Sequence, residues 1–331
     1  MRYAIVGSGK FGRELTRILL NNGKKVLLFS RRATEIDSIN ANSKSLTGFI
    51  FPNAQNLKAT NDPLELSKAR CLFLTFSSKD IKNALSSLPI NHNQTFVSCI
   101  KGFENSLGLL PSEVLIQKFG VKKKNIIVLS GPNLSKEIAN KELTATVLAG
   151  ENNELLREIG KDLKNDYFIP FLSSDINGVE IAGALKNIYA IVSGYFHAKR
   201  VGENTIGFLL TKSLEEIRIF SQARGGESET FLGLSGVGDF FSTALSKDSR
   251  NYKFGECLAK GLNAEEALKK IDDTVEGYHT SKVVYQKSIE LGLDLKILKF
   301  LIDLYTMKKS KEEAAKILVP DHIENDIRSK L

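Results

Sequence analysis

Cysteine, histidine and long apolar stretches are scarce in this sequence, and each scarcity argues against a class of protein. The three cysteines, Cys71, Cys99 and Cys257, are odd in number and far apart, which is typical of buried thiols in a reducing compartment. The four histidines show no ligand spacing with cysteine, so we expect no metal site. No apolar run approaches the roughly 20 residues that cross a bilayer, and the first residues lack the features of a signal peptide. We therefore expect a cytoplasmic protein without membrane insertion.

Length and charge set the next limits. The 331 residues are roughly twice a typical domain, so we predict two domains, and 42% hydrophobic with 25% charged residues is ordinary for a soluble globular chain. The formal net charge is +8. A solvated basic surface, an anionic small-molecule site and nucleic acid could each account for it. Because the basic residues are spread along the chain instead of clustered, we expect no nucleic-acid partner.

The first half alternates short apolar runs with helical stretches. Several runs are almost continuously apolar, as parallel strands must be when helices cover both faces of a sheet. A helix expected at residues 12–22 lies between the first two runs and gives a strand–helix–strand unit. Its repetition predicts a Rossmann-type doubly wound sheet over residues 1–175. The expected strands are Tyr3–Val6, Lys25–Ser30, Cys71–Phe76, Thr95–Ile100, Asn125–Leu129, Thr144–Leu148 and Tyr167–Leu172.

From residue 176 the apolar spacing becomes helical. Asp175 is expected to cap a long helix whose apolar stripe runs from Ile181 to Tyr195. Convincing strands are absent, so residues 176–331 are predicted to form an all-α domain. The charged tail Asp321–Leu331 is expected to fray. Further helices are expected at Thr205–Phe220, Tyr252–Lys260, Ala264–Ile271, Thr280–Leu291 and Ile297–Met307.

Residues 7–12 read Gly-Ser-Gly-Lys-Phe-Gly, a G-x-G-x-x-G pattern between the first strand and its helix. Gly7 permits a tight turn, Gly9 lets the backbone approach a pyrophosphate, and Gly12 lets helix and strand pack closely. The free N–H groups of the helix start face the anion. This position in the chain predicts that the first domain binds a dinucleotide.

The end of the second expected strand bears on the choice of cofactor. An NAD site usually places an acidic residue there to hold the ribose 2′-hydroxyl. This chain has Arg31 and Arg32 instead, and the nearest acidic residue is Glu35. Paired arginines suit a 2′-phosphate, so NADP(H) is favoured. One arginine could instead stack on adenine, which keeps NAD(H) as an alternative.

Four further segments carry residues that suit chemistry. Lys101 ends an apolar strand, which is where open α/β sheets bind ligands, and Lys186 lies in a long helix. Taken alone, Lys101 could be a solvated strand-end charge, and Lys186 would by default be a surface lysine. The four segments are Ile100–Gly102, Ser130–Asn133, Gly183–Asn187, and Gly233–Asp239 with Ser249–Asn251.

Together these segments resemble the NAD(P)-dependent glycerol-3-phosphate dehydrogenase family of bacteria. The matching motifs read GALKN, GLSGVGD, SRN and LSGPN, with support from VGENT at 201–205 and VEG at 275–277. The likeness runs from Met1 to about Leu318. It implies an oxidoreductase that reversibly reduces dihydroxyacetone phosphate to sn-glycerol 3-phosphate with NAD(P)H, supplies glycerophospholipid synthesis, and forms a homodimer.

The resemblance also implies roles for individual residues. Lys186 would be the general acid/base that protonates the C2 oxygen as hydride arrives. A free lysine near pKa ~10.4 is a poor base at neutral pH, so the reductive direction suits it. The implied substrate-binding residues are Lys101, Gly131, Asn133, Asp239, Ser249, Arg250 and Asn251. The cofactor-binding residues, from the glycine pattern, the paired arginines and the resemblance together, are Gly7, Gly9, Lys10, Phe11, Gly12, Arg31, Arg32, Lys101, Ser135, Arg250 and Glu276.

The chain departs from the family at several positions. Phe11 stands where tryptophan is common, and Lys10 adds a positive charge near the pyrophosphate. The other departures are Asn133, Ser135, Glu203, Lys212 and a missing proline at 294–296. They leave the reaction class unchanged and bear on fine cofactor preference.

Two other readings stay open from the sequence. A 2-hydroxy-acid or ketopantoate-type reductase would share the two-domain plan and the helix lysine, but the Ser249–Asn251 triplet suits a phosphorylated ketone better than a carboxylate. A catalytically silent NADP(H) sensor would have no need of Lys101, Lys186 and Asp239.

Overall fold

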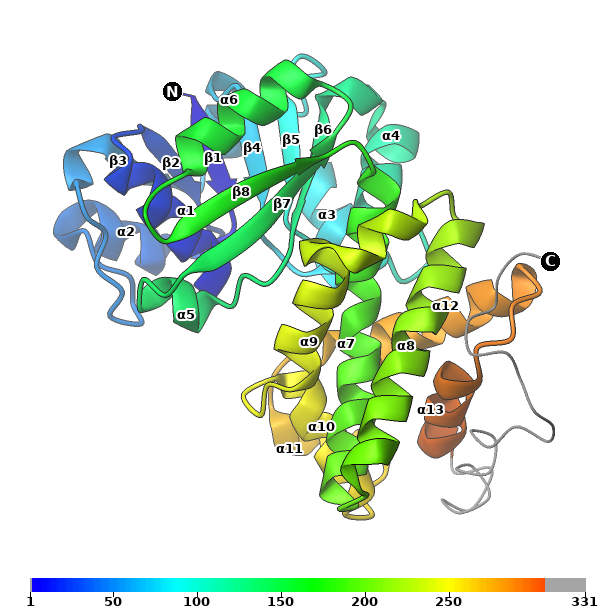
Figure 1. Ribbon diagram of the computed structural model, residues 1–331. Helices are drawn as coiled ribbons and strands as arrows, with labels where there is room; N and C mark the ends of the chain where they lie inside the picture. The colour runs from blue at the N-terminus through cyan, green and yellow to red at the C-terminus, as the bar shows by residue number, and fades with distance from the viewer. Residues whose placement is uncertain (1, 307–331) are drawn as a thin grey trace. The chain divides into compact units, whose positions relative to one another are not determined.

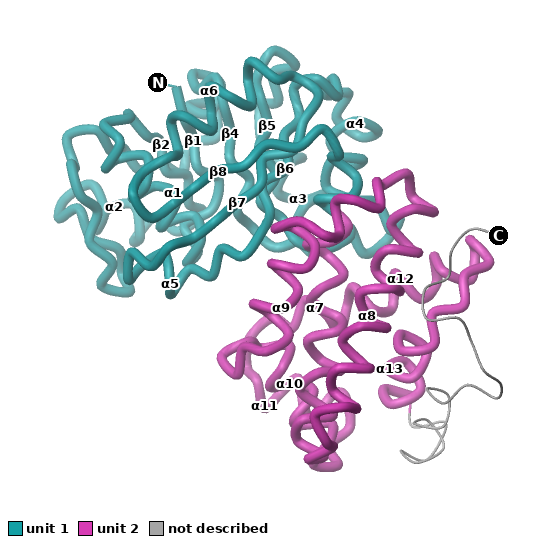
Figure 2. The backbone as a smooth tube through the Cα atoms, in the orientation of Figure 1, with its two compact units in different colours: residues 1–180 teal, residues 181–331 magenta. Residues whose placement is uncertain are grey.

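The computed structural model describes residues 2–306, and the chain divides into unit 1, residues 1–180, and unit 2, residues 181–331 (Figure 2). The sequence predicts the boundary between the two domains at 175/176, where the helical spacing of apolar residues begins. The structure places it inside a helix because the first turn of that helix is bound to unit 1: the Glu180 carboxylate accepts the Ser112 N–H at 3.1 Å and also the Ser112 hydroxyl. The tail Asp321–Leu331 lies outside the described residues.

Unit 1 is built on a single sheet of parallel strands with one antiparallel junction. The strand order is β3-β2-β1-β4-β5-β6-β7-β8, and every neighbouring pair is parallel except β6 with β7 (Figure 1). The carboxyl ends of β1 to β6 therefore lie along one edge. The strands are β1 (Tyr3–Val6), β2 (Val26–Phe29), β3 (Leu57–Thr60), β4 (Cys71–Leu74), β5 (Thr95–Ser98), β6 (Ile126–Ser130), β7 (Thr144–Gly150) and β8 (Phe168–Ser173).

The predicted Rossmann-type sheet is confirmed, with strand bounds that shift by one or two residues. Strand β3 is the exception, since the sequence does not predict it. It lies at the edge of the sheet and is short, with Lys58 exposed and Leu57 only half-buried. An edge strand with one solvated face lacks the continuous apolar run that marks its neighbours.

Helices cover both faces of this sheet (Figure 1). Alternate residues of β1 show why its run is continuously apolar: Tyr3 and Ile5 pack into one core with α1, α2, α5 and α6, while Ala4 and Val6 pack into the opposite core with α3 and α4. The helices of unit 1 are α1 (Lys10–Asn21), α2 (Ala33–Asn42), α3 (Ile81–Ser86), α4 (Pro111–Phe119), α5 (Ser135–Ala139) and α6 (Asn153–Leu163).

Unit 2 is helical, as predicted, and its described part, residues 181–306, contains no strand. Helix α9 was not predicted, and α12 begins four residues before the expected start at Thr280. The helices are α7 (Ile176–Ala198), α8 (Glu203–Ala223), α9 (Asp239–Ala244), α10 (Arg250–Ala259), α11 (Ala264–Ile271), α12 (Glu276–Glu290) and α13 (Lys296–Thr306), with a π-helical turn at Leu234–Gly238.

Buried carboxylates hold the starts of three helices. The Asp175 carboxylate accepts the Gly178 N–H at 2.7 Å, so the predicted cap of α7 is confirmed. Glu180 binds the start of α4, and burial raises its pKa to about 8. Glu216 on α8 accepts the N–H groups of Ile297 and Leu298 at the start of α13, and burial raises its pKa to about 7. These carboxylates satisfy amides that a helix start leaves without partners.

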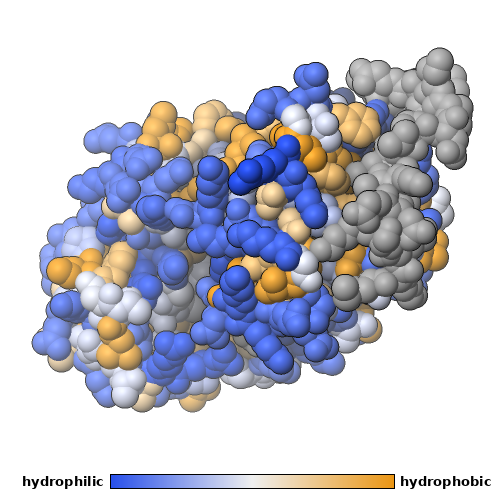
Figure 3. Space-filling view, turned by 90° about the horizontal axis from the view of Figure 1, so that it is seen from below, coloured by the Kyte–Doolittle hydropathy of each residue, from blue (hydrophilic) through white to orange (hydrophobic). Residues whose placement is uncertain are grey.

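The surface is predominantly hydrophilic on the face that Figure 3 shows, with hydrophobic residues in small, separate groups. Among the described residues, no helix combines the length and the apolarity that a membrane span requires. Of the cysteines, Cys71 and Cys257 are buried and Cys99 is partly buried, and burial raises the pKa of the Cys71 and Cys99 thiols.

Candidate active site

The glycine turn between β1 and α1 needs glycine at two positions for the fold alone. Gly7 has φ +122°, a conformation that other residues rarely adopt. A Cβ on Gly12 would lie 2.1 Å from the Gly7 carbonyl oxygen and 2.7 Å from Thr75 Oγ1. Gly9 differs, because its φ of −67° suits any residue and a Cβ there would meet nothing within 4 Å. The open space at Gly9 is therefore available for a ligand.

The start of α1 has the properties of an anion site. No side chain caps it, and its first turn carries no acidic residue. Thr75, the first residue after β4, donates its hydroxyl to the carbonyl oxygens of Val6 and Gly7 at 3.1 and 3.0 Å. It thereby fixes the turn at the point where the strand order reverses, which is where such sheets bind ligands. Thr75 was not predicted as a site residue from the sequence; its place directly after the strand beside β1 was the available signal.

The segment that follows β2 places two positively charged side chains at the surface. Arg31 and Arg32 are both exposed. Ser30 accepts a hydrogen bond from the Ser8 hydroxyl at 3.0 Å and from the Arg32 N–H at 3.3 Å, which ties this segment to the glycine turn. Glu35 is buried, and its carboxylate accepts the Leu46 N–H at 2.9 Å. The nearest acidic residue is thus engaged by its own loop.

Lys101, Gly131 and Asn133 come together at the carboxyl edge of the sheet. Lys101 follows β5 after Cys99 and Ile100, and its ammonium donates to the Gly131 carbonyl oxygen at 3.1 Å and to Asn133 Oδ1 at 3.2 Å. Gly131 has φ +125°, and a Cβ there would lie 3.2 Å from the Thr146 Cα, so glycine is required. Asn133 Nδ2 donates to Thr146 Oγ1 at 3.2 Å. Thr146 is a second residue that was not predicted from the sequence.

Ser135 lies at the start of α5, two residues beyond Asn133, and is partly buried. At the other end of the cofactor group, Lys10 is exposed and Phe11 is partly buried against the core of unit 1. The binding of a cofactor by these three residues stays a prediction from the sequence.

Lys186 and Asp239 form a direct, buried ion pair within unit 2. Lys186 is 5% exposed on α7, and Asp239, the first residue of α9, is fully buried. The surface position that is the default for a helix lysine is therefore wrong. The π-helical turn sets the place of Asp239, and it closes so tightly that a Cβ on Gly236 would lie 2.4 Å from the Phe231 Cα.

Next to this pair, a buried polar network joins α7, α10 and α12. Asn251 Nδ2 donates to Asn187 Oδ1 at 3.1 Å, and Asn187 Nδ2 donates to Glu276 at 3.2 Å. The Gly277 N–H donates to Asn251 Oδ1 at 2.9 Å. A Cβ on Gly277 would lie 2.3 Å from the Asn187 carbonyl oxygen, so the helices approach closely here. Asn187 belongs to the GALKN motif but was not assigned a role from the sequence.

Arg250 and Ser249 stand at the start of α10. The Ser249 hydroxyl caps the helix by accepting the Tyr252 N–H at 3.4 Å. The Arg250 guanidinium is exposed and pairs with Asp273 at 2.7 Å. Since both partners are solvated, this ion pair is weak and can be exchanged for a ligand anion. The structure joins Lys186 to Asp239, and it joins Asn251 to Glu276 through Asn187.

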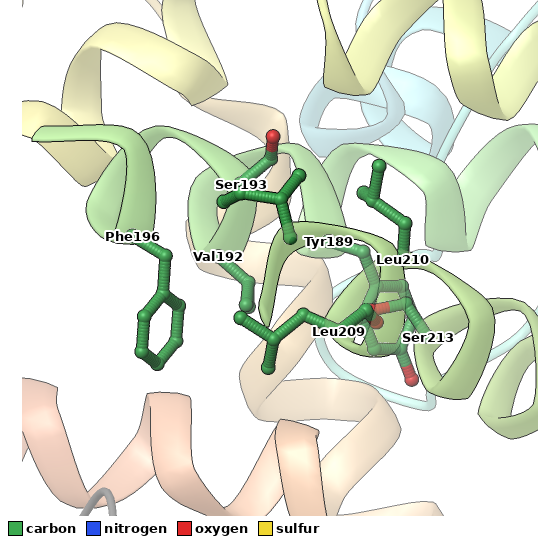
Figure 4. Close-up of a pocket in the computed structure, with 8 residues that line it drawn as sticks. Tyr189, Val192, Ser193, Phe196, Leu209, Leu210 and Ser213 are labelled. Carbon is green, nitrogen blue, oxygen red and sulfur yellow. The ribbon is translucent and has the colours of Figure 1, made fainter. Parts of the chain in front are cut away.

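A recess between α7 and α8 is a poor candidate for an anionic ligand (Figure 4). Its polar atoms already have partners: the Ser193 hydroxyl donates to the Ala244 carbonyl, the Ser213 hydroxyl to the Leu209 carbonyl, and the Tyr189 hydroxyl to Glu216. The rest of its lining is apolar. Within residues 2–306, no cluster of three or more His, Cys, Asp or Glu side chains is placed to hold a metal ion.

Comparison with known proteins gives a consistent result across the chain. Two family models, described as the N-terminus and the C-terminus of NAD-dependent glycerol-3-phosphate dehydrogenase, match residues 2–156 and 175–316. The chain belongs to this family. It is therefore an oxidoreductase of the nicotinamide-dependent class, and the family and enzyme class predicted from the sequence are confirmed.

Individual relatives agree. A protein from Alcanivorax borkumensis named glycerol-3-phosphate dehydrogenase [NAD(P)+] is 39% identical over 88% of this chain and 85% of its own length. One of the same name from Pseudomonas fluorescens Pf-5 is 34% identical over 98% of this chain and 95% of its own. The glycerol-3-phosphate dehydrogenase structure from Coxiella burnetii has a TM-score of 0.86 at 26% identity, covering 96% and 98% of the two chains.

The geometry of the glycine turn predicts that Gly9→Ala weakens cofactor binding without harming the fold, because only a bound pyrophosphate would meet the new methyl group. Gly202→Ala is a matched control: Gly202 precedes α8 with φ −68°, and its Cβ would also meet nothing within 4 Å. Titration with NADPH should show an affinity loss of about tenfold or more for Gly9→Ala alone, with both variants melting like the wild type. Equal NADPH affinities for the two variants would contradict this.

Proposed function

We propose that this chain reduces dihydroxyacetone phosphate to sn-glycerol 3-phosphate, reversibly, with NADPH as the favoured cofactor and NADH as the alternative. Unit 1 would bind the cofactor, and unit 2 would supply the acid and most of the substrate contacts. The observation that carries the proposal is the buried ion pair between Lys186 and Asp239. Both residues lie in the part of the chain that matches the C-terminal family model of glycerol-3-phosphate dehydrogenase. When bound, the reduced nicotinamide supplies a hydride to C2 of the ketone.

Lys186 is the residue we assign to proton transfer. Reduction of a ketone adds a hydride to carbon and a proton to oxygen, so an acid must stand beside that oxygen. The Lys186 ammonium meets this need: Asp239 holds it in place, and burial keeps water from competing for it. After it donates a proton to the C2 oxygen, the amine regains one from solvent. Lys101 and Asn133 would orient the same substrate, with Gly131 lining it.

The substrate phosphate is assigned to the start of α10. Arg250 offers a planar fork of donors that stays charged, and Asn251 follows it directly. Ser249 would lie beside them, with its hydroxyl also capping the helix. The same guanidinium would reach the cofactor, as would Glu276 beside Asn187. This assignment requires the Arg250 guanidinium to leave Asp273 and to bind the substrate phosphate instead.

The preference for NADPH rests on the segment after β2. Arg31 and Arg32 are exposed there, and both can form charge-assisted hydrogen bonds to a 2′-phosphate. Glu35 accepts the Leu46 N–H and lies 3.9 Å from Arg13, so it is engaged away from the position where an NAD site holds the 2′-hydroxyl. Lys10 adds positive charge beside the glycine turn.

The cellular role that we propose is supply of glycerol 3-phosphate for glycerophospholipid synthesis, in the cytoplasm, by a homodimer. The formal net charge of +8 supports the proposed cofactor and substrate, because a basic protein attracts both an anionic cofactor and a doubly charged substrate.

The substrate assignment predicts strong discrimination by the phosphate. NADPH oxidation should be rapid with dihydroxyacetone phosphate and lower by about 10²-fold or more in kcat/KM with dihydroxyacetone, because the second ketone offers Arg250 no anion. Ketopantoate, a carboxylate substrate, serves as the control for a 2-hydroxy-acid reductase. Equal rates on the two forms of dihydroxyacetone would refute the phosphate assignment, and turnover of ketopantoate alone would favour the other reductase class.

The acid assignment predicts that Lys186→Met lowers turnover by about 10²–10⁴-fold while NADPH affinity is nearly intact. This variant leaves Asp239 as an uncompensated buried charge, which typically costs about 3–5 kcal/mol of stability. The double variant Lys186→Met, Asp239→Asn removes both charges and is expected to regain that stability while staying inactive. Turnover of Lys186→Met within about threefold of wild type would show that the ammonium is not the acid.

The cofactor assignment predicts that Arg31→Ala combined with Arg32→Ala weakens NADPH binding by about tenfold or more while NADH binding changes little. Lys68→Ala is the control, since Lys68 is equally exposed but precedes β4 at the opposite edge of the sheet. Dissociation constants for both cofactors, measured for each variant, give the ratio. If the ratio of the NADPH and NADH dissociation constants is the same in the arginine variant as in wild type, neither arginine binds the 2′-phosphate.

A further inference from the structure

A threonine on β7 stands behind the lysine at the carboxyl edge of the sheet in unit 1. Thr146 is fully buried, and its hydroxyl donates to the Ser130 carbonyl oxygen at 2.9 Å. The hydroxyl oxygen of Thr146 accepts a hydrogen bond from Asn133 Nδ2 at 3.2 Å. Asn133 Oδ1 in turn accepts the Lys101 ammonium at 3.2 Å. A chain of hydrogen bonds thus runs from the interior of the sheet to a lysine that we place at the substrate.

The direction of this chain follows from the donors that each group possesses. A threonine hydroxyl has one hydrogen, and Thr146 gives it to Ser130. Towards Asn133 the Thr146 oxygen can therefore only accept, so it must face the amide nitrogen. The amide oxygen of Asn133 is then turned to Lys101. With the amide reversed, its NH₂ group would face an ammonium and its oxygen would face a hydroxyl with no hydrogen left to give.

Burial makes this arrangement selective. Asn133 is 7% exposed, and Ser130 is 2% exposed, so water cannot readily replace a lost partner. Gly131 lies between them with its carbonyl oxygen on Lys101 and its Cα against Thr146, which leaves the segment little room to shift. The Gly131 carbonyl oxygen and Asn133 Oδ1, which accept hydrogen bonds from the ammonium, are thereby positioned from β7.

We infer that Thr146 is a positioning residue for the reaction: its hydroxyl fixes the amide orientation of Asn133, and Asn133 in turn holds the Lys101 ammonium where it binds substrate. The inference rests on the proposed function for the role of Lys101. In this role Thr146 acts only through Asn133 and Lys101.

Thr146→Val tests this, because valine keeps the shape of the side chain and removes the hydroxyl. We expect kcat/KM for dihydroxyacetone phosphate to fall about tenfold, chiefly through KM, since the hydrogen bond lost is one that supports a charged group. Thr146→Ser restores the hydroxyl and should restore kcat/KM. Thr144→Val is the matched control, since Thr144 is 2% exposed on the same face of β7 but donates its hydroxyl to the Glu142 carbonyl.

A second readout is independent of turnover. Competitive acetylation of Lys101, followed by peptide mass spectrometry, should run several-fold faster in Thr146→Val than in wild type or Thr144→Val, because Asn133 no longer holds the ammonium. Thr146→Ala, which removes the same hydroxyl with a smaller group, is measured beside it in case the valine does not fold.

The outcomes separate the inference from the proposed function. A wild-type enzyme that does not reduce dihydroxyacetone phosphate would refute the proposed function, and the Lys101 labelling would then decide the inference alone. With an active wild type, unchanged kcat/KM and labelling in the hydroxyl-free variants would overturn the inference. So would an equal loss in Thr144→Val, which would show only that β7 had been weakened.

Discussion

The buried ion pair between Lys186 and Asp239 is the interaction on which the proposed chemistry of this protein depends. Removing a charge from water is costly, and a buried charge is tolerated only when an opposite charge and further hydrogen bonds accompany it. Lys186 on α7 therefore requires a carboxylate at one position, and the π-helical turn at Leu234–Gly238 supplies it by delivering Asp239 at the start of α9. The tight approach of Gly236 to Phe231 is part of this turn, and the approach of Gly277 to Asn187 closes the neighbouring network of Asn187 and Asn251.

Unit 1 meets a different requirement, which is to gather backbone donors and cations at one edge of a sheet. The parallel strands β1 to β6 all end at that edge. The glycine turn, the arginines after β2 and Lys101 after β5 therefore all lie along it. Two threonines hold the residues at this edge: Thr75 holds the glycine turn, and Thr146 orients Asn133. In each case one threonine hydroxyl holds neighbouring polar groups in place.

Much of the fold could be predicted from the sequence, because strands buried on both faces leave continuous apolar runs and helices leave a regular stripe. Strand β3 was not predicted because Lys58 is exposed and Leu57 is only half-buried at the sheet edge. The motifs identified Lys186 and Asp239, but helical periodicity placed Lys186 at the surface, since the partner that permits its burial lies 53 residues further along the chain. Thr146 and Asn187 could not be assigned because their roles consist of hydrogen bonds between distant segments.

The central claim is that the Lys186 ammonium gives its proton to the substrate. A crystal structure of the protein with NADP⁺ and sn-glycerol 3-phosphate bound together tests this most directly. The account predicts that the Lys186 Nζ lies within about 2.6–3.2 Å of the C2 oxygen while Asp239 still contacts the amine. A bound substrate whose C2 oxygen is held by other groups, with the Lys186 amine out of hydrogen-bonding reach, would contradict it.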